Sequence, residues 1–337
     1  MEILEQIRRY SIMRNCLCIL SLCFGHLGFS QSLEDKIYTA TEIFIAKQND
    51  KTFQTLIEQE IDFQKNAKSK SEFLALVFLK NNKAYFLKEK NKLPQAISTY
   101  ENAWELYTKH KLAKITDYDI IEFCLKPLGN LYTKTNNYTN AENTIKEYIS
   151  IAEKQQNNEQ YVAGIINLAV LYRTLNKHES VIQLTENTLT NEKLTSKQRQ
   201  NLKDLSLQSK IALGKLEKAD DLGEKNTPNY FQKAYALSLK NNEPDKAISY
   251  FKKYEEALAQ QEITQRELAK FYVEKAHLYF RMSDAEHPSE NLEIANTALE
   301  TAIQTLIPTY KKGSIPNTDE LFAENTFIDI FELIAEI

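Results

Sequence analysis

The residues that could bind a metal or act in catalysis are few, and their spacing suits neither task. Beyond residue 30 the histidines are His110, His178, His277 and His287. No two of them stand at ligand spacing on one helix, so the sequence does not predict a zinc site. It also contains no glycine loop for phosphate and no Gly-x-Ser-x-Gly turn. We therefore expect a protein that is not an enzyme and that uses no cofactor or metal.

Two clusters of charge also have simpler explanations than a binding site. An expected turn carries Asp284, Glu286, His287 and Glu290. This cluster could form a weak cation site, but a solvated loop that caps a helix is favoured. A mild basic cluster comprises Lys90, Lys92, Lys109 and Lys111. No aromatic residues interleave with these lysines, and the net charge is −4, so no nucleic-acid partner is predicted.

The first thirty residues resemble a targeting segment. Residues 13–30 have a positive Arg14, an apolar stretch from Cys16 to Phe24, and small residues at Gly28 and Ser30. This pattern predicts a secretory signal peptide that is cleaved before Gln31, and hence a periplasmic or extracellular protein. Its Phe-Ser-Gln ending resembles signal peptides of Bacteroidetes. Residues 1–12 would then lie upstream of the true start of translation.

Two alternatives to cleavage remain open. The segment could stay attached as an uncleaved anchor, although its apolar core is shorter than the roughly 20 residues of a spanning helix. The run from Leu20 to Cys23 faintly resembles a lipoprotein motif, although Leu22 stands where a small residue is needed. Cleavage before residue 31 would leave Cys124 as the single cysteine, which excludes an internal disulfide. Its apolar neighbours predict a buried, inert thiol rather than a nucleophile.

Composition favours helices. The chain has 337 residues but only 7 glycines and 7 prolines, fewer than turn-rich β architectures need. One phrase recurs along the chain. A small residue is followed three positions later by an aromatic or aliphatic residue, and after a short polar turn comes Ala, with another aromatic or aliphatic residue about four positions on. The phrase occurs as Ala84–Leu87–Ala96–Tyr100, Gly129–Tyr132–Ala141–Ile145, Ala169–Tyr172–Val181 and Ala276–Tyr279. Its spacing predicts stacked helical hairpins, with small residues where two helices approach closely.

The hairpins are expected at regular places along the chain. The predicted pairs are 33–48 with 50–66, 70–90 with 93–109, 117–136 with 138–156, 158–176 with 178–191, 196–213 with 216–226, 228–241 with 244–261, and 264–283 with 289–307. In the first pair, Ile37, Ile43 and Phe44 are expected to face Phe53, Leu56, Ile57 and Ile61. The array spans 31–308, and residues 309–337 would form a loop and the start of a further, incomplete repeat, with a helix beginning near Asp319.

The phrase resembles the tetratricopeptide repeat, whose first helix carries Leu-Gly/Ala-x-x-Tyr and whose second carries Ala-x-x-x-Phe/Tyr. The resemblance covers most of residues 70–305. It implies an all-α, right-handed superhelix of stacked hairpins, a non-enzymatic scaffold that holds a protein or peptide in a concave groove. The period is 45 residues from Ala84 to Gly129 and 40 from Gly129 to Ala169. The standard repeat has about 34, so longer helices are expected.

The resemblance also implies a candidate peptide site. Lys126 and Asn130 lie four residues apart and share one helix face, and Asn167 follows on the first helix of the next pair. In some tetratricopeptide domains, Lys and Asn at these positions clamp the C-terminal carboxylate of a peptide. Asn201 and Leu205 stand where the following repeat would supply basic residues, which departs from that pattern.

The C-terminal stretch 298–329 resembles secreted Bacteroidetes proteins in which such an array precedes a CHAT domain, a caspase-like fold. The resemblance implies that this chain is the recognition part of such a protein. Nothing in the sequence matches the CHAT domain itself, so we expect either the N-terminal array of a longer protein or a truncated copy. The alternative is the periplasmic sensor array of an envelope receptor of the histidine-kinase type, without its membrane span and kinase.

Overall fold

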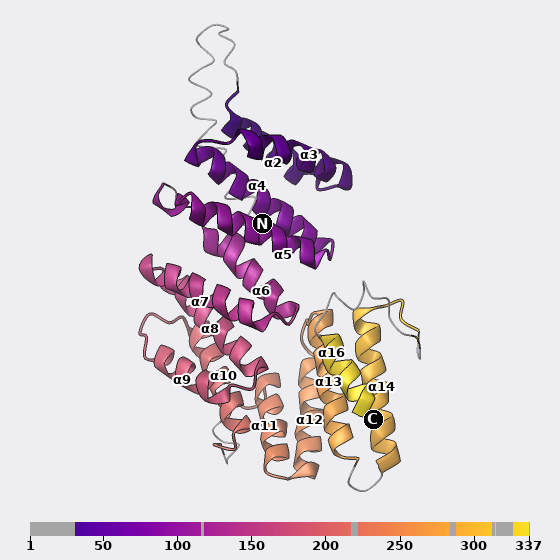
Figure 1. Cartoon of the computed structure of the whole chain (residues 1–337). Helices are drawn as coiled ribbons and strands as arrows, with labels where there is room; N and C mark the ends of the chain where they lie inside the picture. Colours follow the sequence, from indigo (N-terminus) through magenta and orange to yellow (C-terminus); the bar gives the residue numbers. More distant parts are fainter. Residues whose placement is uncertain are drawn as a thin grey trace. The chain divides into compact units, whose positions relative to one another are not determined.

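The structure is a computed structural model that describes residues 31–115, 118–216, 222–283, 288–311, 314 and 326–336 (Figure 1). Every regular element among these residues is a helix. The chain divides into two compact units, Met1–Ala75 and Leu76–Ile337. The expected signal peptide lies outside the described residues. None of the described helices is both long enough and apolar enough to cross a bilayer.

The first unit contains the hairpin of α2 (Leu33–Lys47) and α3 (Asp50–Asn66). Both helices start with an N-cap residue, whose side chain accepts a hydrogen bond from a backbone N–H of the first turn. The Ser32 hydroxyl caps α2, and Asn49 with Thr52 forms a reciprocal capping box on α3. The rings of Phe44 and Phe53 pack with their centroids 5.8 Å apart.

Two of the residues expected inside this hairpin point to solvent instead. Ile43 is 54% exposed and Ile61 is 70% exposed, so the prediction that they face the partner helix is wrong. The buried apolar residues are Ile37, Phe44, Leu56 and Phe63. A helix buries only one stripe, and Phe44 rather than its neighbour Ile43 occupies it.

Most of the second unit consists of successive helical hairpins. Its helices are α4 (Lys70–Glu89, whose first turns belong to the first unit), α5 (Leu93–Lys109), α6 (Lys126–Lys134), α7 (Tyr138–Lys154), α8 (Asn158–Thr174), α9 (His178–Leu189), α10 (Ser196–Ala212), α11 (Pro228–Lys240), α12 (Pro244–Leu258), α13 (Gln265–Arg281), α14 (Pro288–Leu306) and α16 (Thr326–Glu336). Neighbouring helices pack as antiparallel pairs, and further contacts join one pair to the next, as α8 with α10 and α10 with α11 (Figure 1).

One turn geometry connects the two helices of several hairpins. In the turn after α6, Asn136 adopts the left-handed conformation with φ 58°. Its N–H donates to the carbonyl of Thr133 at 3.2 Å, and the next N–H, of Asn137, donates to the carbonyl of Tyr132 at 2.8 Å. These two bonds define a Schellman ending, which satisfies the last carbonyls of the helix. The same geometry recurs at Asn91, Asn176 and Asn242.

The recurring small residues lie where two helices meet. Ala84, Ala96, Ala141, Ala169 and Ala276 are fully buried, and Gly129 is buried beside Ile145 and Thr144 of α7. The tightest approach, however, is at a glycine that the repeat phrase did not mark. A Cβ built on Gly164 of α8 would lie 2.5 Å from Ile149 Cγ1 and 2.7 Å from Tyr148 Cε2, both on α7.

The helix that leads into α6 is widened at one turn. Residues Ile121–Leu125 form a π-helical turn, in which the Lys126 N–H donates to the carbonyl of Ile121, five residues back. Pro127 follows directly; it lacks an N–H, and its ring would collide with the carbonyl four residues earlier in a regular helix. The wider turn accommodates this ring. The predicted helix 117–136 therefore runs from Ile120 to Lys134, and residues 116–117 lie outside the described part.

The short second helix expected at 216–226 is not formed where the structure describes it. Leu222 is in 3₁₀ conformation and fully buried beside Ile211 and Ala234, and residues 223–227 form bends and turns, with Gly223 at φ 97°. Residues 217–221 lie outside the described part. A single leucine thus covers part of the apolar face that a second helix would have covered.

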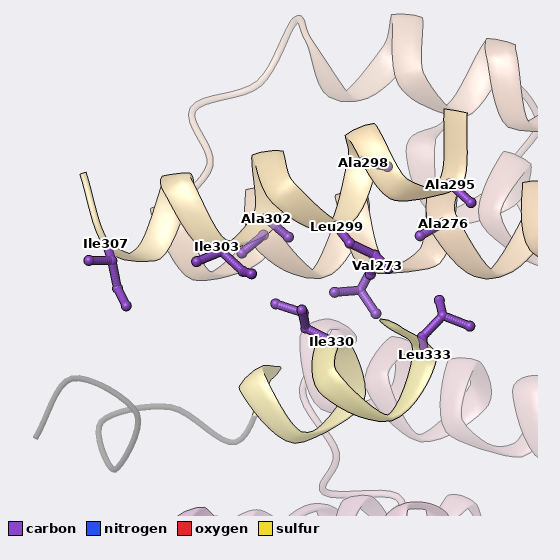
Figure 2. Packing of buried hydrophobic residues seen from close by; sticks show 11 residues of the cluster. Val273, Ala276, Ala295, Ala298, Leu299, Ala302, Ile303, Ile307, Ile330 and Leu333 are labelled. Carbon is purple, nitrogen blue, oxygen red and sulfur yellow. The ribbon is translucent and has the colours of Figure 1, made fainter. Parts of the chain in front are cut away.

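The last described helix, α16, packs across α13 and α14. Its Ile330 and Leu333 are buried against an apolar cluster that includes Val273 and Leu299 (Figure 2). Helix α16 begins at Thr326, and the residues between 319 and 325, where the start was expected, lie outside the described part.

Candidate ligand-binding surface

The three residues of the expected carboxylate clamp lie on two helices. Lys126 of α6 forms an ion pair with Glu122 at 2.9 Å, one turn earlier on the same helix. Asn130 is exposed on α6. Asn167 of α8 donates to the hydroxyl of Tyr148 at 2.8 Å. Tyr148 lies on α7 and its side chain is buried. Lys126 and Asn167 would therefore have to leave their present partners to bind a peptide carboxylate.

The tyrosines of the repeat phrase have a structural role. Tyr132 donates its hydroxyl to Glu101 on α5, and Tyr172 donates to Glu142 on α7 at 2.9 Å. Each tyrosine thus reaches back to a carboxylate on the preceding helix instead of being left in water. Lys146 and Lys177 also approach Glu142, and these positive charges and hydrogen bonds hold its pKa below the ordinary value.

Cys124 is fully buried, and its thiol donates to the carbonyl of Tyr100 at 3.4 Å. Burial raises the pKa of this thiol far above its ordinary value, so the reactive thiolate is suppressed. The interpretation of Cys124 as an inert thiol agrees with this setting.

No grouping of His, Cys, Asp or Glu that could hold a metal ion is found within the described ranges. Of the acidic turn considered above, Asp284, Glu286 and His287 lie outside them. Glu290 lines an open cavity of about 280 Å³ between α13 and α14, together with Glu293 and Lys275. Lys275 already forms an ion pair with Glu255 of α12 at 2.8 Å. The four basic residues at 90, 92, 109 and 111 are exposed, as solvated turns are.

A different set of polar side chains does converge in the second unit. It begins between α10 and α11, where Asp204 accepts from Lys233 Nζ at 2.6 Å and from Asn229 Nδ2 at 2.6 Å. The Lys233 side chain is only 2% exposed, so its charge depends on this partner. The pair ties two successive hairpins together.

The set continues from α11 to α13 at Glu274. Its two carboxylate oxygens accept from Gln232 Nε2 at 2.8 Å and from the Tyr235 hydroxyl at 2.9 Å. Burial raises the pKa of Glu274 above its ordinary value, and the two hydrogen bonds with the positive charges of Arg173 and Lys270 only partly oppose that rise. The pKa of Tyr235 is raised as well, first by burial and then by the Glu274 charge.

The third part is Arg173 near the end of α8. Its Nη1 donates to the side-chain oxygen of Gln208 on α10. Burial lowers the pKa of this guanidinium and the charge of Glu274 opposes the change, so each of the two charges affects the pKa of the other. His178 lies near as well, since burial and then the Arg173 charge lower its pKa. We call Arg173, Asp204, Gln208, Gln232, Lys233, Tyr235 and Glu274 the polar cluster.

Comparison with known proteins now places the fold. Residues 128–155, which cover most of α6 and α7, match the tetratricopeptide repeat family. A tetratricopeptide repeat protein from Parabacteroides merdae ATCC 43184 has a similar structure, with a TM-score of 0.53 and 14% sequence identity over 90% of this chain and 99% of that chain. The fold is tetratricopeptide-like. The apo form of the quorum sensor NprR from B. thuringiensis also matches over 98% of this chain and 90% of its own, with 14% identity and a TM-score of 0.49. No curated protein gives a significant match to the sequence.

Within this fold the polar cluster has a consistent location. All of its residues lie on α8, α10, α11 and α13, each of which stands where the repeat pattern places the first helix of a hairpin. Asp204 and Gln208, and likewise Gln232 and Tyr235, stand three or four residues apart and so share one side of their helices. Lys233 instead reaches Asp204 on α10. Sequence reasoning missed the cluster because its members belong to four different repeats. The sequence offered one signal: a polar or charged residue stands close to a small residue of the repeat phrase, as Arg173 does to Ala169 and Glu274 to Ala276.

Proposed function

We propose that this protein is a non-enzymatic scaffold that binds an extended peptide or a partner helix along the first helices of its hairpins. The observation that carries the proposal is the polar cluster. Apolar contacts hold the stacked hairpins together, and the buried pair of Lys233 with Asp204 adds to them. Arg173, Gln208 and Glu274 are by contrast only partly buried on the first helices of their hairpins. Such groups give a binding surface its specificity and orientation.

The fold supports the same proposal. A stack of helical pairs offers side chains from many repeats to one partner, which suits segments of polypeptide better than small metabolites.

The proposal can be tested by site-specific photo-crosslinking in the native cell. A photoreactive residue placed at Gln208, in the polar cluster, should capture a discrete polypeptide. The same residue placed at Lys252, which is exposed on α12, should not. Equal labelling from both positions, or none from Gln208, would argue against a binding surface on the first helices.

Export is part of the proposal and rests on the pattern of residues 13–30. Amino-terminal sequencing of the protein from the cell envelope should begin at Gln31. A start at Met1 or Met13 would instead favour the uncleaved anchor.

The finer proposal is that the scaffold recognises ligands for a CHAT domain, and it rests on the resemblance of residues 298–329 alone. The DNA beyond the codon for Ile337 tests it. A frame encoding a caspase-like domain with its His and Cys supports it, whereas a membrane span followed by a kinase supports the receptor instead.

A further inference from the structure

The two cations of the polar cluster, Arg173 and Lys233, differ in the charge of their hydrogen-bond partners. Lys233 is paired with Asp204 at 2.6 Å, and Lys210 of the same region is paired with Glu186 at 2.7 Å. Arg173, by contrast, has a neutral partner: within the described part of the chain its one hydrogen bond is to the amide of Gln208, and it forms no ion pair.

The surroundings of Arg173 make this arrangement unfavourable in the absence of a ligand. Its guanidinium is partly buried, and the loss of solvent lowers its pKa. A guanidinium carries five N–H donors in a planar fork, of which Nη1 contributes one to Gln208. Glu274 acts on it electrostatically, but the oxygens of Glu274 already accept from Gln232 and Tyr235.

We propose that Arg173 is the anchor for a carboxylate of the bound peptide, with Gln208 fixing the orientation of its fork. This inference rests on the proposed function and names the chemistry of the ligand. A carboxylate matches the fork of an arginine in two parallel hydrogen bonds, which point charges such as lysine cannot reproduce. It would supply the opposite charge that Arg173 lacks among its hydrogen-bond partners in the described residues.

Glu274 adds a second, oriented element to this site. It lies on α13, whereas Arg173 lies on α8, so the two opposite charges come from different hairpins. A peptide that places its acidic group on Arg173 can direct a backbone N–H or a basic side chain toward Glu274. The pair therefore fixes the direction of the peptide as well as its position.

The test uses a positional library of octapeptides, synthesised once with free C-terminal carboxylates and once with C-terminal amides. We expect the purified protein to select Asp or Glu at one position or to require the free carboxylate. Comparison of the two libraries tells which source supplies the acid. Replacing the selected acid by its amide should weaken binding at least about tenfold.

Variants assign the preference to Arg173. In Arg173→Gln the acidic preference should disappear, and Arg173→Lys should restore only part of it because the fork is lost. Arg281→Gln is the matched control: Arg281 is exposed on α13 and forms no interaction with the described residues. Circular dichroism shows which variants fold; if Arg173→Gln does not, Arg173→Lys alone must reduce the acidic preference.

The outcomes separate the two proposals. A protein that binds no member of either library refutes the scaffold proposal and this inference together. Binding without an acidic preference, or a preference that Arg173→Gln and Arg173→Lys leave unchanged, overturns the carboxylate anchor and leaves the scaffold intact.

Discussion

Replacing Gly164 by alanine should destabilise the contact between α7 and α8. The added methyl group would lie 2.5 Å from Ile149 Cγ1 and 2.7 Å from Tyr148 Cε2, well inside van der Waals contact. Tyr148 cannot easily turn away, because its ring is buried and its hydroxyl accepts from Asn167 at 2.8 Å. Either this hydrogen bond is lost or the two helices separate.

The expected size follows from three contributions. Overpacking of a filled core typically costs about 1–3 kcal/mol, and a lost hydrogen bond adds about 1 kcal/mol. The higher helix propensity of alanine returns about 1 kcal/mol. We therefore expect Gly164→Ala to lower the free energy of unfolding by about 1–3 kcal/mol.

Gly129→Ala is the matched control, because its methyl group would lie 3.3 Å from Ile145 Cγ1 and needs only a small adjustment. The propensity gain should then make this variant equal to or more stable than the wild type. Urea unfolding measures the total effect, and hydrogen exchange of α7 and α8 places it in the structure. A Gly164→Ala protein as stable as Gly129→Ala would refute the reasoning about close approach.

Three further predictions concern single side chains. Burial raises the pKa of Glu274 above its ordinary value of 4.5, so the ionised carboxylate opposes folding at neutral pH. As the pH falls through the raised pKa toward 4.5, the wild type should therefore gain stability relative to Glu274→Gln. Parallel melting temperatures for the two proteins across this range would contradict it. Tyr172→Phe removes the hydrogen bond to Glu142 and should cost about 1 kcal/mol in urea unfolding, whereas Tyr279→Phe, whose hydroxyl bonds to no described residue, should change little. Cys124 should react with a thiol reagent only after denaturation, in a chain that lacks its first thirty residues; rapid reaction of the folded protein would exclude a buried thiol.

Helices with a strong pattern could be predicted closely. The predicted helices 138–156 and 158–176 are found as Tyr138–Lys154 and Asn158–Thr174. Apolar residues at helical spacing mark such segments, and polar residues with a left-handed conformation end them. The helix expected at 216–226 does not continue through its described end, because residues 223–227 form bends and turns after the buried Leu222.

The polar cluster was not predicted from the sequence, for a different reason. Lys126 and Asn167 match a known arrangement in position, but the structure gives each of them a partner from its own surroundings. Glu274 and Arg173 are separated by about a hundred residues in the sequence, and no local pattern connects them. Their interaction depends on how successive hairpins are stacked.

The sequence by itself determined the helical fold and the positions of small residues between paired helices, because these follow from periodicity within a few turns of chain. The apolar residues beside Cys124 in the sequence also indicated that its thiol is buried. The tertiary structure alone decided that Gly164 leaves less room for a side chain than Gly129, and that Lys233 is paired with Asp204. It also decided that Arg173 has Gln208 as its one hydrogen-bond partner among the described residues. Each of these depends on distances between different helices, and the electrostatic effect of burial on a charge is set by those distances.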